Sequence, residues 1–185
     1  MRKLAVIAAL MGTQAAAAGL EIEVAGEATG TIAIDLFEDS APGHVDQITA
    51  LAEAGAYDGV VFHRVIDGFM AQTGDVRYGD RNADDFDMRR AGTGGSDRGN
   101  LEAEFSDSLS FDRGVVGMAR AADPDSANSQ FFIMFAPAPH LDGQYTIVGE
   151  VTAGMEVVDA IKRGQGRNGA VIGEPDWMVS VSVTD

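Results

Sequence analysis

The chain has 185 residues, of which 45% are hydrophobic, so it can fill one core and is expected to form a single domain beyond any leader. Its 29 acidic side chains against 13 basic ones give a formal net charge of −16, which repels phosphate backbones and anionic lipids, so nucleic-acid binding is not expected. The lack of cysteine excludes disulfides, a thiolate nucleophile and a lipid-modified cysteine.

The first 18 residues have the layout of a secretory signal peptide. Two cations, Arg2 and Lys3, precede the apolar run Leu4–Met11, and Ala16 and Ala18 offer a small-x-small cleavage site. The run is too short to span a bilayer, and a buried N-terminal helix is the less favoured alternative because the run has no amphipathic stripe. We therefore expect a domain over residues 19–185 in the periplasm, monomeric and not inserted in the membrane after the leader is cleaved.

Eight short runs bounded by Gly, Asp and Asn are predicted to be strands. They show no long period in which strands alternate with helices, which favours an antiparallel barrel or sandwich. The runs are Glu21–Ala25, Thr31–Leu36, Val61–Val65, Met70–Thr73, Val115–Ala119, Phe131–Phe135, Thr146–Val148 and Met178–Val183.

Two amphipathic helices are predicted between these strands. The first runs from its N-cap Ser40 to about Ala54, with Gly55 as its stop, and the second covers Gly154–Arg163 and ends at Gly164. Each helix has an apolar stripe that must be covered, and the open ends of a small barrel are the natural places for them.

A long segment without periodicity, rich in Asp, Arg and Gly, lies between Arg77 and Leu101. Loops of this length are usually functional or mobile.

The stretch Val61–Asp75 carries the strongest functional signal. An alternating strand brings Arg64 between apolar neighbours, turns at Asp67-Gly68 and returns with Phe, Met and Gln, which sets one cation and one amide beside an apolar floor. Such a site suits an uncharged substrate with a polarisable amide. A second stretch, Gly117–Ala121 followed by Ser129–Ile133, accompanies it downstream.

Linked sequence blocks resemble the cyclophilins, the peptidyl-prolyl cis/trans isomerases, from about Ile22 to Val183. Several blocks in the same order are far more specific than one short pattern. The resemblance, which points to the bacterial branch, implies a mainly β fold, a closed eight-stranded antiparallel barrel capped by two α-helices. The blocks are Val61–Asp75, Gly92–Gly95, Gly114–Ala121, Ser129–Ile133, Leu141–Gly143 and Val148–Val151 with Gly154-Met155.

The resemblance also implies the catalytic residues. Twisting an X-Pro bond breaks amide resonance and leaves the imide nitrogen basic, so a guanidinium that donates to this nitrogen stabilises the twisted state more than either planar state. Arg64 matches the catalytic arginine, and Gln72 matches the glutamine that holds the substrate carbonyl. No nucleophile, cofactor or metal is needed.

The remaining site residues carried over from the family bind substrate. Gln130 matches a second amide lining the groove, for which a purely structural hydrogen bond is an equal alternative. His63 matches a family histidine, expected to point away from Arg64 with a structural role. A metal role is not expected, because the three histidines lack ligand spacing. The proline pocket and groove would comprise Phe69, Met70, Phe132 and Leu141, with Ala119 and Arg120 beside the peptide main chain.

Three departures from the family pattern stand out. His140 replaces a tryptophan, which removes an indole donor and a large apolar face, so cyclosporin should bind weakly. Tyr145 replaces a groove histidine and keeps an aromatic wall with a polar tip. The segment Arg77–Ala91 is longer than the usual family pattern.

We therefore expect an isomerase that acts on proline-containing segments of unfolded or exported proteins. The main alternative is a proline-binding holdase or scaffold with little turnover, which the intact Arg64 disfavours. A barrel that carries a small ligand inside is disfavoured because the barrel interior in the family is packed.

Overall fold

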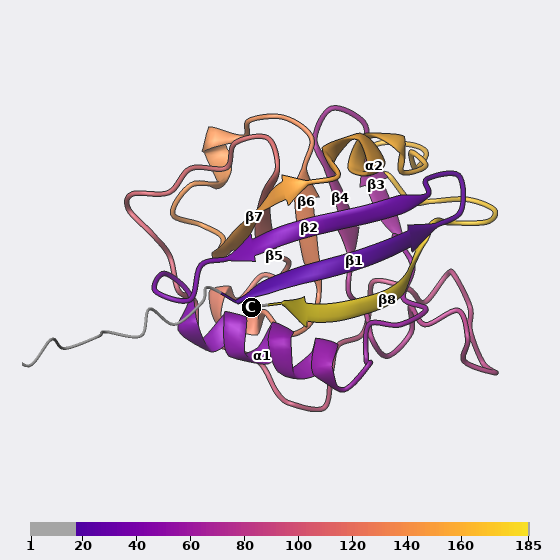
Figure 1. Cartoon of the computed structure of the whole chain (residues 1–185), viewed down its shortest axis with the longest axis horizontal. Helices are drawn as coiled ribbons and strands as arrows, with labels where there is room; N and C mark the ends of the chain where they lie inside the picture. The colour runs from indigo at the N-terminus through magenta and orange to yellow at the C-terminus, as the bar shows by residue number, and fades with distance from the viewer. Residues whose placement is uncertain (1–17, 185) are drawn as a thin grey trace, which may run out of the picture.

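The computed structural model describes residues 18–184, so the predicted signal peptide lies almost wholly outside the described residues. Eight antiparallel strands form one sheet in the order β3-β4-β6-β5-β7-β2-β1-β8. In Figure 1, β1, β2 and β8 cross in front of β4 and β6, which run at a steep angle to them. The strands are β1 Gly19–Ala25, β2 Gly30–Leu36, β3 Arg64–Ile66, β4 Met70–Thr73, β5 Val115–Met118, β6 Phe131–Met134, β7 Ile147–Ala153 and β8 Trp177–Thr184.

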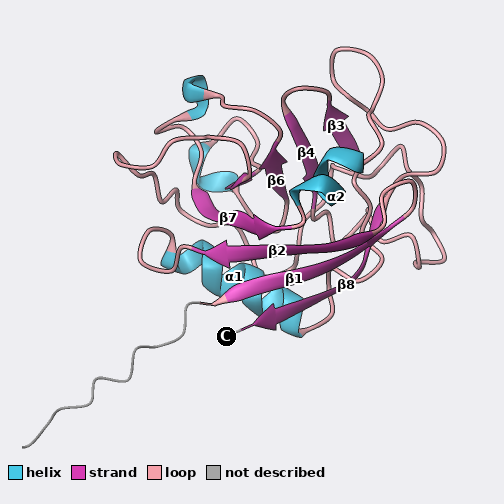
Figure 2. Ribbon diagram, turned by 45° about the horizontal axis from the view of Figure 1, so that its top comes forward, coloured by secondary structure: helices cyan, strands magenta, loops and turns pink. Residues whose placement is uncertain are grey.

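The sheet is curled, and the expected closed barrel is not confirmed. The edge strands β3 and β8 are not paired in a ladder within the described residues, because β3 begins only at Arg64 and is three residues long. Residues just before β3 approach β8 instead: Gly59 N donates to Met178 O at 2.7 Å, and Met178 N donates to Val60 O at 2.9 Å. Figure 2 shows the resulting curled, open arrangement. The number of strands, their antiparallel direction and the presence of two helices are as predicted.

Both helices pack against the sheet, α1 (Pro42–Glu53) near β8 and α2 (Met155–Ala160) near β2. Ser40 was predicted as the N-cap of α1, which is wrong: the N-cap is Ala41, with no side-chain cap. The backbone N–H of Ser40 donates a hydrogen bond to Phe37 O at 3.0 Å, so Ser40 belongs to the turn before the helix. Gly55 ends the helix as predicted, with a φ of +67° that favours glycine.

The second helix is shorter than predicted. It ends at Ala160, because Ile161 already has an extended backbone and the Asp176 carboxylate accepts a hydrogen bond from Lys162 N at 2.6 Å. The hydrogen bond to the buried Asp176 therefore ends the helix before Arg163. Asp176 also accepts from Ala28 N at 3.0 Å, which ties the β1–β2 turn to the same point.

Alternation along β4 and β6 separates two apolar clusters. Ala71 and Ile133 face the large core inside the curled sheet, whereas Met70 and Phe132 belong to a second cluster on its other face. This division follows from the two-residue period of a strand. The second cluster also contains Leu141 and lies where the sequence predicts the proline pocket.

Candidate active site

The β3–β4 hairpin brings the two predicted catalytic residues together. Gly68, with a φ of +67°, forms the turn, and Phe69 N donates to Ile66 O at 3.0 Å. The register places Arg64 directly opposite Gln72, so the two side chains extend from the same face of the hairpin. Gln72 in turn lies opposite Phe132 of β6, which sets the polar pair beside an apolar floor.

A chain of hydrogen bonds fixes the orientation of the guanidinium. One terminal nitrogen of Arg64 donates to Gln72 Oε1 at 3.0 Å, and Gln72 Nε2 donates to Gln130 Oε1 at 3.0 Å. Gln130 Nε2 then donates to Gly94 O at 2.7 Å, and Arg64 Nε donates to Asn168 O at 2.9 Å. Because these acceptors belong to neutral amides, the guanidinium is held in place without a carboxylate that would offset its charge.

Nine of the predicted residues line one small pocket of about 140 Å³. Its wall includes an edge-on contact of Phe132 with Tyr145, whose ring centroids lie 5.9 Å apart. The arrangement offers an apolar floor for a small ring and a guanidinium and an amide at its rim. The lining residues are Arg64, Phe69, Met70, Gln72, Ala119, Arg120, Phe132, Leu141 and Tyr145.

Three predicted residues lie outside that pocket. Gln130 lines an adjoining groove of about 500 Å³, together with Gly92–Ser96. The exposed ring of His140 stacks on Phe69 with centroids 6.0 Å apart and so forms the outer rim. His63 is buried and faces a different space from the small pocket.

The electrostatics of the site keep one charge at its centre. Burial lowers the pKa of His63 to about 4, opposed by the nearby Asp75 carboxylate, so the imidazole is neutral at neutral pH. Partial burial lowers the pKa of Arg64 from a value so high that the guanidinium remains charged. Among residues 18–184, no group of three or more His, Asp or Glu side chains could hold a metal ion.

Some residues that shape the site carry no recognisable signal in the sequence. The carbonyl of Asn168 holds Arg64, but any residue type can supply a backbone carbonyl. The side chain of Arg120 stacks over Tyr145 at 4.5 Å and donates to Gln144 O at 2.9 Å, so it braces the wall of the pocket. Only the groove position of Arg120 was predicted.

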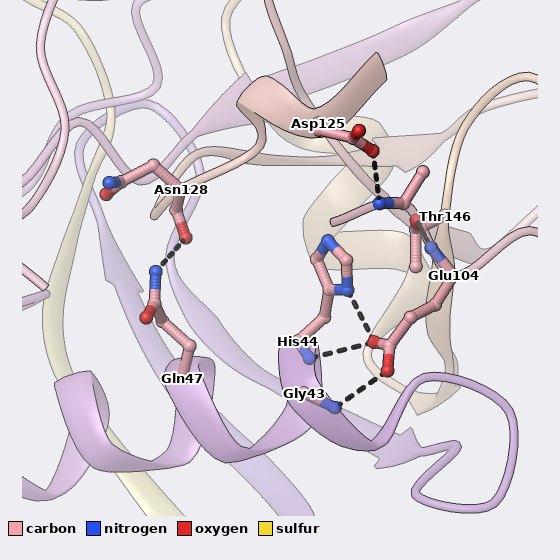
Figure 3. A network of polar contacts seen from close by, with 8 residues as sticks. Gly43, His44, Gln47, Glu104, Asp125, Asn128 and Thr146 are labelled. Carbon is pink, nitrogen blue, oxygen red and sulfur yellow. Dashed lines mark hydrogen bonds and ion pairs between the residues drawn. The ribbon is translucent and has the colours of Figure 1, made fainter. Parts of the chain in front are cut away.

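A network of polar contacts anchors the far side of the groove to α1 (Figure 3). The Glu104 carboxylate accepts hydrogen bonds from Gly43 N and His44 N, both at 3.0 Å, and from His44 Nδ1 at 2.6 Å. Gln47 donates to Asn128 O at 3.0 Å, two residues before Gln130. Glu104 thus replaces the side-chain cap that α1 lacks, and the helix holds the segment before β6 that carries Gln130.

Fold and site together define a β-rich domain with a small apolar pocket rimmed by a guanidinium and an amide. The family model for the cyclophilin type peptidyl-prolyl cis-trans isomerase/CLD family matches residues 20–183. The chain belongs to this family, whose isomerases interconvert the cis and trans forms of X-Pro bonds.

Relatives and solved structures agree with this membership. A Brucella suis protein named "Probable peptidyl-prolyl cis-trans isomerase" is 53% identical over 154 residues, 83% of this chain and 78% of the relative. A peptidyl-prolyl cis-trans isomerase of Helicobacter pylori is 40% identical over 138 residues, 73% of this chain and 76% of the relative.

The fold is also similar to a cyclophilin-type isomerase of Cryptosporidium parvum, with a TM-score of 0.76 and 26% identity over 92% of this chain and 99% of that one. A structure of that protein in the presence of the dipeptide Ala-Pro gives a TM-score of 0.73 and 25% identity, covering 90% of this chain and 99% of that one.

Proposed function

We propose that Arg64 is the catalytic residue and that the 140 Å³ pocket takes the proline ring of an extended peptide. The observation that carries this proposal is the fixed guanidinium of Arg64 beside the apolar floor formed by Met70, Phe132 and Leu141. With the proline ring on this floor, the imide nitrogen lies close to the guanidinium. Gln72 donates to the substrate carbonyl after exchanging its bond to Gln130.

The energetics suit a mechanism without covalent chemistry. Uncatalysed isomerisation takes tens to hundreds of seconds. If an event that takes about ten seconds is to occur at about 1–1,000 per second, the activation free energy must fall by roughly 1.4–5.5 kcal/mol. A hydrogen bond from a charged donor contributes about 1.5–3 kcal/mol, more when water is excluded. Arg64 gains this bond only as the imide nitrogen loses conjugation, which is the differential binding that catalysis needs.

We infer further that the clients are exported proteins folding in the periplasm. The leader-like first 18 residues and the acidic, cysteine-free composition support this location. Within the described residues, no helix is long and apolar enough to cross a membrane. Proline isomerisation limits folding on the scale of seconds to minutes, so a client with a slow proline step would gain from such an enzyme.

Two experiments test these proposals separately. A protease-coupled assay on residues 19–185, with an Ala-Pro peptide, measures turnover; binding without turnover would instead identify a holdase or scaffold. Fractionation of cells that express the full chain, followed by sequencing of the mature N-terminus, tests export. Recovery of the uncleaved chain in the cytoplasm would overturn the proposed location and leave the catalytic proposal intact.

A further inference from the structure

Hydrogen bonds to one carboxylate hold the two ends of the long segment after Asp75 close together. The Asp75 carboxylate is fully buried, and one of its oxygens accepts from Arg77 N at 3.1 Å and from Tyr78 N at 3.0 Å. The other oxygen accepts from Gly92 N at 2.8 Å and from Gly94 N at 2.9 Å. A single carboxylate therefore closes residues 76–94 into a loop, which we call the 76–94 loop.

Side-chain contacts also order the middle of the 76–94 loop. The guanidinium of Arg90 lies over the ring of Tyr78 at 3.9 Å, and that of Arg81 lies over Trp177 of β8 at 3.6 Å. Such contacts contribute about 0.5–2 kcal/mol each. These contacts give the 76–94 loop a defined conformation packed against the sheet, although its sequence has no periodicity.

Between the 76–94 loop and residues 168–175 lies a groove of about 810 Å³, which we call the loop groove. This volume is within the range of about 300–1,000 Å³ that is usual for ligand sites. The side chain of Ile172 in the wall of this groove is 59% exposed, so its apolar surface is open to a ligand in the groove. Charged residues, Arg89 and Glu174 among them, also line the loop groove. Its apolar lining consists of Phe86, Met88, Ala91, Ala170, Val171, Ile172 and Pro175.

The loop groove adjoins the proline pocket. Arg64 and Gln72 line both spaces and so form the wall between them. A peptide whose proline occupies the pocket passes over this wall within one to three residues, since each extended residue spans about 3.3–3.6 Å. His63 also lines the loop groove, is 6% exposed, and has no hydrogen-bond partner within residues 18–184 for either ring nitrogen.

We propose that the loop groove is a second substrate subsite, which takes a large apolar side chain of the client peptide one to three residues from the proline. This inference rests on the proposed function. The occupant is the client itself, because the groove shares Arg64 and Gln72 with the pocket that holds its proline and its lining is largely apolar. The 76–94 loop contains the segment Arg77–Ala91, which the family resemblance predicts to be longer than usual, and it thereby acquires a role in substrate selection.

Two peptide series test the subsite. The first has alanine at every position around Ala-Pro, and the second places leucine at each of the three positions before or after the proline in turn. The variants are Met88→Ser and Ile172→Ser, which remove apolar contact from opposite walls of the loop groove. Val179→Ser is the matched control, because Val179 is 39% exposed on β8 and lies outside the groove.

We expect one leucine position to raise kcat/KM of the wild type about tenfold over the alanine peptide, through a lower KM. Met88→Ser and Ile172→Ser should remove most of this gain and leave the alanine peptide unchanged. The exposed Ile172→Ser should also keep the thermal unfolding curve, whereas Met88→Ser should lower it slightly because Met88 also packs against the large core. Val179→Ser should retain the full gain. Equal rates for all leucine positions, or equal loss on both peptide series, would overturn the subsite.

Calorimetry separates this proposal from the proposed catalytic function. If the wild type does not turn over the alanine peptide, the catalytic proposal fails, but the affinity for the best leucine peptide still reports on the loop groove. The subsite predicts that Ile172→Ser weakens this affinity about tenfold and that Val179→Ser does not. An unchanged affinity in Ile172→Ser contradicts it, as does a dimerisation of the wild type that Ile172→Ser abolishes, which would assign the groove to a second copy of the chain.

Discussion

Arg64 donates a hydrogen bond to Gln72 from directly across the β3–β4 hairpin, at 3.0 Å. Gln72 is in turn hydrogen-bonded to Gln130, the residue before β6. These contacts order the guanidinium of Arg64 before substrate binds. The conformational entropy of this side chain is therefore lost when the protein folds and not when it binds substrate. Neutral partners keep the charge available for the imide nitrogen.

Gln72→Glu tests whether that neutrality matters. The side chain keeps its shape and its acceptor for Arg64, but it brings a carboxylate to the guanidinium and loses the donor to Gln130. We expect kcat/KM to fall about ten- to a hundredfold, because the carboxylate offsets the charge that acts on the imide nitrogen. Gln165→Glu adds the same charge at an exposed position and should have no effect. Wild-type turnover in Gln72→Glu would show that the charge of Arg64 does not stabilise the transition state.

The activity should be nearly independent of pH between about 6 and 8. Arg64 stays charged over this range, and His63, whose pKa lies at about 4, stays neutral. Chelators should also have no effect. A rise in kcat/KM that follows a group titrating near pH 6.5, or a loss with EDTA that added metal reverses, would contradict the mechanism.

Stability, in contrast, should depend on pH through His63. Its pKa in the folded protein, about 4, is below the ordinary histidine value of 6.5, so between these two pH values the unfolded state binds a proton that the folded state does not. The stabilisation from a neutral His63 is fully present above pH 6.5 and is lost as pH falls through 4. Urea unfolding should show that, when the pH is lowered from 7 to 4.5, the free energy of unfolding falls by about 2–3 kcal/mol more in the wild type than in His63→Gln. An NMR titration of the His63 ring that shows protonation near pH 6.5 would refute this.

Cyclosporin should bind weakly, and His140→Trp should tighten binding by about one to two decades. His140 is exposed and stacked on Phe69 at the rim, so a larger indole there adds apolar area and a donor without displacing the pocket residues. Turnover of a peptide should change little. A dissociation constant that calorimetry finds unchanged would show that His140 is not the limiting departure from the family.

Strand alternation made most of the site predictable. The alternating positions around Arg64, the Asp67-Gly68 turn and the return through Met70 and Gln72 are local features, and the hairpin forms as they require. The pairing of β4 with β6 joins residues about sixty positions apart, and there the family resemblance supplied what local pattern could not. Nine predicted residues meet in one pocket for this reason.

Features set by long-range backbone contacts were not predictable. The end of α2 depends on Asp176, which lies beyond the helix and has no periodic relation to it. The cap of α1 comes from Glu104, about sixty residues downstream, so Ser40 was the better candidate from sequence alone. The open edge between β3 and β8 depends on how few residues of the Val61–Val65 run enter the ladder.

The central claim is that the fixed guanidinium of Arg64 accelerates rotation about the X-Pro bond. The most direct measurement is kcat/KM of Arg64→Ala in the protease-coupled assay, with Arg98→Ala as an exposed control and thermal unfolding as a check of the fold. The account predicts a loss of about one to three decades in Arg64→Ala, a clear loss also in Arg64→Lys, and none in Arg98→Ala. Full turnover by a folded Arg64→Ala protein would contradict it.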